Sequence, residues 1–176
     1  MLHEDRIYRS LINKDNLISY NVKIAESDLL ISSDTDLSDD ALRSLIKHRH
    51  SLESYIENHH DFKDSLLPLP LDHLASSIVR DMLTKSKICG VGPMAGVAGA
   101  IAEFVGFDLL DKTENIIIEN GGDIFIKTNN NLIVSVYAGE SPLSYNVNFV
   151  VKPGETPMGI CTSSATVGPS INFGKA

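Results

Sequence analysis

Residues 115–126 read Asn-Ile-Ile-Ile-Glu-Asn-Gly-Gly-Asp-Ile-Phe-Ile: two apolar runs that flank a pair of glycines. The first run lacks polar alternation, which is typical of a strand buried on both faces. The Asn120–Asp123 segment predicts a turn, because glycine accepts the positive φ that a tight hairpin needs. Paired glycines also let a backbone approach a ligand closely. The sequence alone therefore leaves both interpretations of this segment open.

More strands are predicted on either side of this stretch. Residues 18–24 alternate between apolar and polar side chains, so that Ile18, Tyr20, Val22 and Ile24 share one face. The full set of predicted strands is 7–11, 17–24, 28–33, 115–119, 124–126, 132–137, 145–151 and 158–161, with hairpin turns at 14–16 and 129–131.

Three helices are predicted between these strands. Residues 38–59 have apolar side chains at helical spacing, with Ser38 as the N-cap. Residues 72–87 follow a proline-containing linker at 66–71, and Met94–Phe107 follows Pro93. The predicted fold class is α+β: one domain, residues 1–176, in which helices 38–59 and 94–107 cover a mixed, mostly antiparallel sheet.

Composition excludes several function classes. The 176 residues are 43% hydrophobic and 22% charged, with a net charge of −8 and no cluster of Lys and Arg, so nucleic acid is not an expected partner. No apolar run of about 18 residues predicts a membrane span, and the first residues lack the pattern of a signal peptide. A cytoplasmic protein is the expectation.

Cysteine and histidine give no clear site. Cys89 and Cys161 are far apart in the sequence, and buried, unreactive thiols are expected. Two histidine pairs, 48/50 and 59/60, have side chains that diverge on a helix. They predict a solvated polar face and no metal site.

Three segments could carry chemistry: Gly90–Gly106, Asn120–Asp123 and Gly159–Gly168. We expect them to converge into one small-molecule or phosphate site. The loop 90–96 precedes a helix N-terminus, which suits an anion, although close packing of helix on sheet explains its glycines equally well. Gly96 and Gly99 inside a helix need a reason such as a close neighbour.

Several side chains in these segments are candidate functional groups. The hydroxyls of Thr162, Ser163 and Ser164 could bind phosphate oxygens, and Cys161 is a candidate nucleophile. Glu103 lies among small and apolar residues, either as a partly buried carboxylate with a ligand role or on the exposed side of the helix.

Residues 92–106, 119–124 and 159–164 resemble a family of uncharacterised proteins related to ApbE, and the strands at 6–33, the helix start at 36–38 and the linker at 67–70 are also similar to it. The resemblance implies an ApbE-like, T-fold-like sheet. ApbE itself is a flavin transferase that uses magnesium and FAD to attach FMN to a threonine of a partner protein.

The chain is similar to the transferase at several motif positions. Asn120-Gly121-Gly122-Asp123 looks like its N-x-G-G-D segment, and Thr162-Ser163 looks like its A-T-S-G segment. Gly99 and Glu103 are similar to the glycine and aspartate of its K-G-x-x-x-D helix.

The chain also departs from the transferase. Ala98 stands where the transferase has lysine, Ser170 stands about where it has a histidine, and D-P-x-T-G does not occur. Relatives continue beyond residues 174–176 with a further strand and helix, and the transferase has magnesium ligands in that region. We therefore expect the chain to lack that strand and helix.

Together these observations predict a glycine-rich cleft that binds FAD, FMN or another phosphate-bearing small molecule, with magnesium as a second candidate ligand. The predicted catalytic residues are Cys161, Asp123 and Glu103; the predicted cofactor-binding residues are Gly92, Met94, Gly96, Gly99, Asn120, Gly121, Gly122, Thr162, Ser163 and Ser164. If the chain is an enzyme, the resemblance implies a transferase.

Two alternatives remain open. The resemblance also implies a role in sulfur assimilation and homocysteine biosynthesis, in which Cys161 would handle sulfur. A ligand-binding module without catalysis is the other alternative, and a homodimer is a further expectation.

Overall fold

The structure is a computed structural model that describes residues 17–138 and 141–161. Its main sheet has five strands in the order β1-β2-β3-β4-β7, and each of the four pairings is antiparallel. These strands are β1 (Ile18–Ile24), β2 (Ser27–Ser33), β3 (Ile116–Asn120), β4 (Asp123–Lys127) and β7 (Met158–Ile160). A separate antiparallel ribbon pairs β5 (Leu132–Ser135) with β6 (Asn148–Val151).

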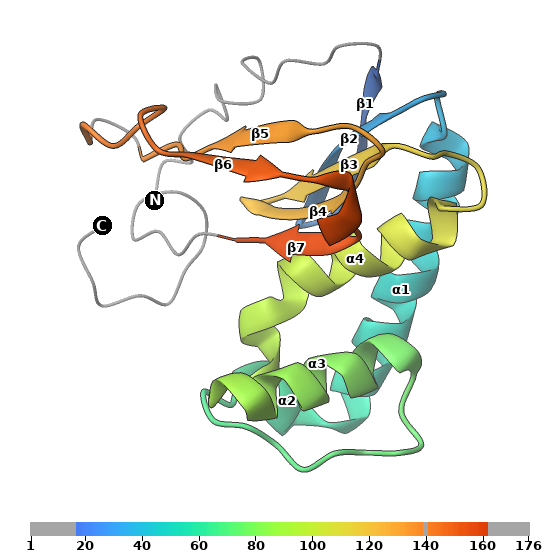
Figure 1. The fold of residues 1–176 in the computed structure, drawn as a ribbon. Coiled ribbons are helices and arrows are strands. Elements are labelled where there is room, and N and C mark those ends of the chain that lie inside the picture. Colours follow the sequence, from blue (N-terminus) through green and yellow to red (C-terminus); the bar gives the residue numbers. More distant parts are fainter. Residues whose placement is uncertain (1–16, 139–140, 162–176) are drawn as a thin grey trace.

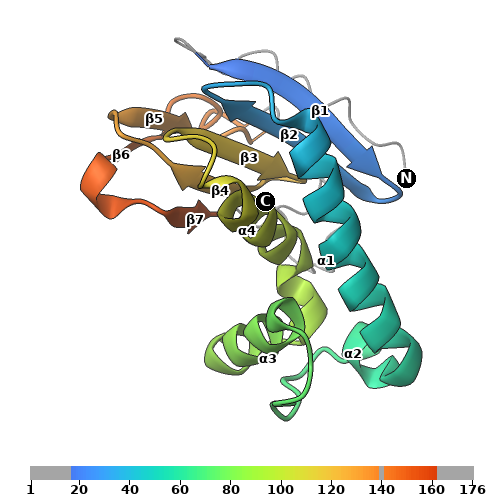
Figure 2. The same ribbon diagram turned by 90° about the vertical axis from the view of Figure 1, so that its right-hand side faces the viewer.

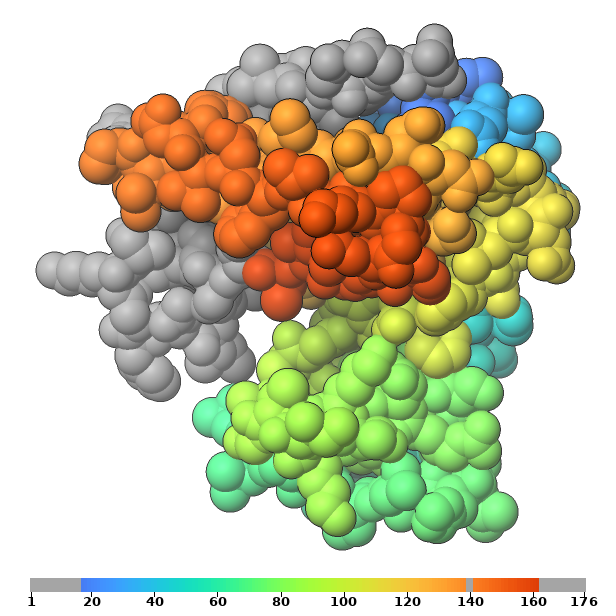
Figure 3. All heavy atoms as spheres, in the orientation of Figure 1, coloured from blue at the N-terminus to red at the C-terminus, as the bar shows by residue number. Residues whose placement is uncertain are grey.

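Two helices, α1 (Ser38–Asn58) and α4 (Val97–Leu109), lie against one face of the main sheet (Figure 1). The helices α2 (His60–Asp64) and α3 (Ser77–Cys89) both lie at the end of the molecule away from the sheet, as the two ribbon views show (Figure 2). Short 3₁₀ helices, η2 (Pro93–Gly96) and η3 (Pro153–Glu155), precede α4 and β7. In Figure 3 the β5–β6 ribbon (orange) forms the surface above the helices. The predicted α+β class is confirmed, as is its mostly antiparallel sheet.

Alternation along the strands places the core between the sheet and the two helices. Ile31, Ile118 and Phe125 follow one another across β2, β3 and β4 on the same face, and all three are buried. Phe125 packs against Gly106 of α4, where an added Cβ atom would lie 2.3 Å from the ring. The absence of a side chain at this position allows α4 to lie close to the sheet.

The structure corrects four expectations about individual elements. Helix α3 begins at Ser77, five residues later than predicted, because Asp72 Oδ1 accepts the backbone N–H of Leu74 and holds that segment in a turn. Asp36 Oδ1 accepts the N–H of Ser38, and Ser38 makes no side-chain cap. The predicted helix 94–107 divides into η2 and α4, since Pro93–Gly96 forms a 3₁₀ turn.

The fourth correction concerns residues 129–131, which were expected to form a hairpin. Strand β4 already pairs with β3 and β7 on its two edges, so β5 cannot join it and pairs with β6 instead. Asn115 Oδ1 accepts the backbone N–H of Asn129 at 2.8 Å and holds the crossing between the two sheets. The predicted strand at 7–11 and turn at 14–16 lie outside the described residues.

In the part of the chain that the structure describes, no single helix is long and apolar enough to cross a membrane. Only α3 together with η2 and α4 reaches the required length and composition, as a pair bent by 105°.

Candidate functional site

The hairpin between β3 and β4 forms the first part of the candidate site. Asn120 pairs with Asp123, and the two residues between them, Gly121 and Gly122, have φ of 64° and 97°. Two positive φ values are what a type I′ turn requires, so the predicted turn is confirmed. The carboxylate of Glu119 accepts the backbone N–H of Gly122 at 2.8 Å and fixes the turn. A Cβ atom added to either glycine would meet nothing within 4 Å, so the outer side of the turn is open.

The first turn of α4 lies directly against this hairpin. Asn120 Nδ2 donates to the backbone carbonyl of Ala98 at 3.0 Å. A Cβ atom on Gly99 would lie 3.3 Å from Asp123 Oδ2, and the backbone N–H of Gly99 donates to the Asp123 carboxyl group. The close neighbour predicted for Gly99 is therefore Asp123, which a larger side chain at position 99 would displace.

Strand β7 brings Cys161 to the same place. Ile160 pairs with Ile124, and Cys161, the next residue, lies near enough to Asp123 for this aspartate to raise the pKa of its thiol. Because side chains alternate along a strand, Cys161 shares the helix-covered face with Asn120 and Asp123. We call Gly99, Asn120, Gly121–Gly122, Asp123 and Cys161 the Asp123 site.

Electrostatics at the Asp123 site disfavour additional negative charge. Burial raises the pKa of Asp123, the Gly99 N–H opposes that rise, and the nearby Glu119 adds to it. Partial burial also raises the pKa of the Cys161 thiol, with contributions from Asp123 and Cys89. The site therefore holds a neutral thiol beside a carboxyl group that retains its proton more readily than usual.

Both cysteines are exposed, which corrects the expectation that they are buried. Cys89 ends α3 and is followed by Gly90, whose φ is 72°. Its influence on Cys161 could not have been found from the sequence, because 72 positions separate the two residues along the chain.

Other predicted site residues have different surroundings. Gly92 packs against the linker, since an added Cβ would lie 1.8 Å from the carbonyl oxygen of Ser65, whereas Gly96 has nothing within 4 Å. Met94 packs against the hydrophobic core. Thr162, Ser163 and Ser164 lie outside the described residues. The roles predicted for all of these residues stay predictions.

Glu103 forms an ion pair between two helices. Lys85 Nζ of α3 lies 2.5 Å from Glu103 Oε2 and 2.9 Å from Asp81 Oδ2. The two carboxylates raise the pKa of Lys85 despite its partial burial, so the ammonium group stays charged. Glu103 therefore has a structural partner, and its catalytic role stays a prediction.

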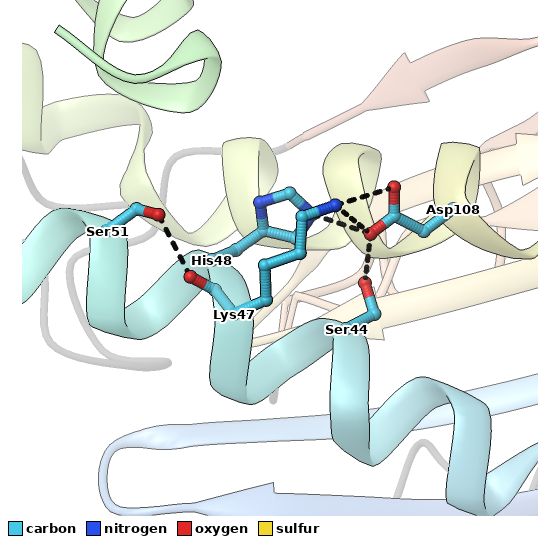
Figure 4. Close-up of polar contacts among 5 residues, drawn as sticks. All are labelled: Ser44, Lys47, His48, Ser51 and Asp108. Atoms are coloured by element: carbon cyan, nitrogen blue, oxygen red, sulfur yellow. Dashed lines mark hydrogen bonds and ion pairs between the residues drawn. The ribbon is translucent and has the colours of Figure 1, made fainter.

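A second polar cluster, around Asp108 of α4, was not anticipated (Figure 4). Asp108 Oδ2 accepts hydrogen bonds from Ser44 Oγ at 2.8 Å and Lys47 Nζ at 3.0 Å, and it lies 2.9 Å from His48 Nε2. His48 is only 6% exposed, so the predicted solvated face is wrong for this histidine, although His50, His59 and His60 are exposed. The edge of its ring also contacts Phe104.

The arrangement of the Asp108 cluster argues for a structural role. A serine nucleophile needs a histidine as its base, but Ser44 donates to the aspartate and makes no hydrogen bond to His48 among the contacts observed. Burial lowers the pKa of His48, although Asp108 opposes this. Burial alone would raise the pKa of Asp108, but hydrogen bonds from Lys47, Ser44 and His48 lower it. The cluster joins α1 to α4.

Among the residues that the structure describes, no group of three or more His, Cys, Asp or Glu side chains could hold a metal ion.

The family model described as AbpE bacteria matches residues 9–176. The chain belongs to this family. The expected membership in an uncharacterised family is confirmed, whereas the relation to ApbE and to its flavin transferase activity stays a prediction.

This member of the AbpE bacteria family is similar to archaeal relatives that are named UPF0280 protein. The relative from Methanococcus aeolicus is 37% identical over 164 residues, which are 91% of this chain and 66% of the relative. The one from Methanocaldococcus jannaschii is 43% identical over 75% of this chain and 54% of its own length. The one from Methanothermobacter thermautotrophicus is 45% identical over 73% of this chain and 50% of its own length. The matches thus span between half and two thirds of these relatives.

Proposed function

We propose that the chain binds a phosphate-bearing small molecule at the Asp123 site, with a flavin nucleotide, FAD or FMN, as the first candidate. One observation carries the proposal: Gly99, the 120–123 hairpin and Cys161 come from three distant segments and meet on one face of the sheet. Convergence of glycine-bearing backbone with a partly buried carboxyl group is typical of ligand sites.

The residues of the Asp123 site fit a nucleotide in a specific way. The first turn of α4 lies against Asn120 and Asp123 of the hairpin, and the positive end of a helix dipole favours phosphate. Asp123 would repel a bare phosphate. It suits either a sugar hydroxyl, which donates to it, or a magnesium ion carried with the phosphates, because Mg²⁺ commonly takes one or two carboxylates plus phosphate oxygens.

The departures of this chain from the motifs of the flavin transferase favour flavin binding without flavin transfer. Ala98 replaces the lysine of the transferase helix, and the D-P-x-T-G motif does not occur in this chain. A bound flavin would supply the redox chemistry, while Asn120 and Asp123 would orient it. The chain spans only part of its relatives' length, so binding without flavin transfer stays a proposal for the whole protein, and so does any partner protein.

Titration with FAD and FMN, with and without MgCl₂, tests the proposal. Flavin fluorescence should change saturably with the unmodified protein. Asp123→Asn should weaken the magnesium-dependent binding about tenfold, the loss expected for one charged contact of about 1.4 kcal/mol.

Asp111→Asn is the matched control, because Asp111 is an exposed aspartate outside the site. No saturable binding by the unmodified protein, or equal weakening by the two variants, would overturn the proposal. Magnesium-independent binding without turnover would instead support the non-catalytic module.

Sulfur handling at Cys161 is the second candidate, and the exposure of this thiol beside Asp123 favours it. The raised pKa of Cys161 opposes it, because the thiolate is the reactive form. The variant Cys161→Ser should slow growth on sulfide as the sulfur source more than Cys89→Ser does. Unchanged sulfide-dependent growth would argue against this candidate.

A further inference from the structure

A surface cavity of about 390 Å³ lies in the helical part of the molecule and shares no residue with the Asp123 site. Its lining comes from four consecutive segments: the end of α1, α2, the linker at 69–72 and α3. The volume is within the range of small-molecule sites. We call it the Tyr55 cavity.

Aromatic side chains form one wall of the Tyr55 cavity. The rings of Tyr55 and His59 stack with a centroid distance of 3.9 Å and an angle of 8°, and Phe62 meets Tyr55 edge-on at 5.1 Å. Two hydrogen bonds hold this wall in place: Tyr55 Oη donates to Asp72 Oδ2 at 3.2 Å, and His59 Nδ1 lies 3.0 Å from the Tyr55 carbonyl oxygen. The wall is ordered before any ligand arrives, which reduces the entropy cost of binding.

The charged groups of the Tyr55 cavity favour a cation. Two carboxylates, Asp61 and Asp72, belong to the described lining, and that lining contains no Lys or Arg. The backbone N–H of Leu74 and the Tyr55 hydroxyl lower the pKa of Asp72, so it is ionised at neutral pH. His59 stacks on Tyr55 and Phe62 is buried, so the attraction for a cation comes from the two carboxylates. A phosphate or carboxylate ligand would be repelled.

We propose that the Tyr55 cavity binds a small aromatic primary amine. The ammonium group would pair with Asp72 and Asp61, while the ring would pack on the aliphatic linker residues Leu69 and Leu71. This assigns the molecule a second site, whose ligand has the charge opposite to that of the ligand proposed for the Asp123 site.

Three probes of the same shape test this site on the unmodified protein: phenethylamine, neutral 2-phenylethanol and anionic phenylacetate. In amide NMR titrations, phenethylamine should shift the signals of residues 55–62 and 69–72 saturably. Binding of 2-phenylethanol should be at least about tenfold weaker, because it lacks the charge-assisted contacts, and phenylacetate should cause no saturable shift. Equal affinities for the amine and the alcohol, or shifts elsewhere in the protein, would overturn the proposal.

Two variants locate the charge effect within the cavity. Asp61→Asn should weaken phenethylamine binding several-fold, while Asp64→Asn, in the same short helix but outside the lining, should leave it unchanged. Both aspartates are exposed, so neither change should prevent folding. Equal affinity in the two variants would show that the carboxylate does not contact the amine, and the proposed pairing would be wrong.

Discussion

Two aspartates lie at opposite ends of α4 and have opposite surroundings. Asp108, in the last turn, receives hydrogen bonds from Ser44, Lys47 and His48 of α1. Asp123, on β4 beside the first turn, has one backbone N–H from Gly99 and the carboxylate of Glu119 nearby. The pKa of Asp108 is lowered, and that of Asp123 is raised.

The difference separates a structural carboxylate from a candidate functional one. Asp108 has enough donors to offset the cost of leaving water, so its contacts stabilise the packing of α1 on α4. Asp123 is partly desolvated and forms no ion pair with any of the residues that the structure describes, and the space beside the adjacent Gly121 and Gly122 is open. A carboxylate in that condition gains most from a hydroxyl, amine or metal supplied by a ligand.

We expect the largest effect from a change that displaces α4, because the surroundings of both Asp108 and Asp123 depend on the position of this helix. Gly106→Val would place side-chain atoms on the ring of Phe125, where even a Cβ would lie at 2.3 Å. Overpacking of this kind should lower the free energy of unfolding by about 2–3 kcal/mol, measured by urea denaturation. Gly96→Val is the control, because a Cβ there meets nothing within 4 Å. Equal losses would show that α4 does not depend on this contact.

Removal of the Asp108 carboxylate, which receives several hydrogen bonds, should have the next largest effect on the free energy of unfolding. Asp108→Ala leaves the buried His48 and the Ser44 hydroxyl without their partner. We expect a loss of about 1–2 kcal/mol, at the lower end for such contacts because the Asp108 side chain is 34% exposed. The exposed Asp111→Ala should change the free energy of unfolding by less than about 0.5 kcal/mol. A neutral Asp108→Ala variant would remove the distinction between the two aspartates.

Substitution of Asp123, whose carboxyl group has one backbone donor, should change the free energy of unfolding with the opposite sign. Because the folded-state pKa of Asp123 is raised, its ionisation at neutral pH opposes folding. Asp123→Asn should therefore be more stable than the unmodified protein at pH 7, by less than about 1 kcal/mol. That gain should shrink as the pH falls through the raised pKa toward the ordinary aspartate value. A variant that is less stable at pH 7 would contradict the proposed desolvation.

His48 sharpens the comparison through the pH dependence of stability. Its folded-state pKa lies below the ordinary value of 6.5, so the unfolded chain takes up a proton first as the pH falls. Its contribution to stability is present above pH 6.5 and is lost as the pH falls through the folded-state pKa. His48→Gln should have a flatter stability curve in this range. Parallel curves for the two proteins would count against a buried, neutral His48.

The smallest expected effect is at Gly99. Gly99→Ala gains about 1 kcal/mol of helix propensity, but its Cβ would lie 3.3 Å from Asp123 Oδ2. The two effects should nearly cancel in the free energy of unfolding. Displacement of the Asp123 carboxyl should still reduce flavin binding in the fluorescence titration. A variant that binds flavin normally would show that the contact between Gly99 and Asp123 is not needed by the ligand.

Local sequence patterns predicted most elements of the fold. The alternation in residues 18–24 and the apolar run at 116–118 identified strands, and the Gly121-Gly122 pair identified the turn between β3 and β4. Each of these signals depends on neighbours within a few residues. The hairpin expected at 129–131 was wrong because strand pairing depends on which edges other strands already occupy.

By itself, the sequence determined the periodicities, the glycine positions and the charge of this protein, since all three depend on residues close together in the chain. Only the tertiary structure decided which partners each of the two carboxylates has. Asp108 meets His48 across 60 positions, and Asp123 meets Gly99 across 24 and Cys161 across 38. Desolvation and hydrogen bonding act through space, so the pKa values that distinguish the two aspartates arise only when α4 packs beside α1 and against the sheet.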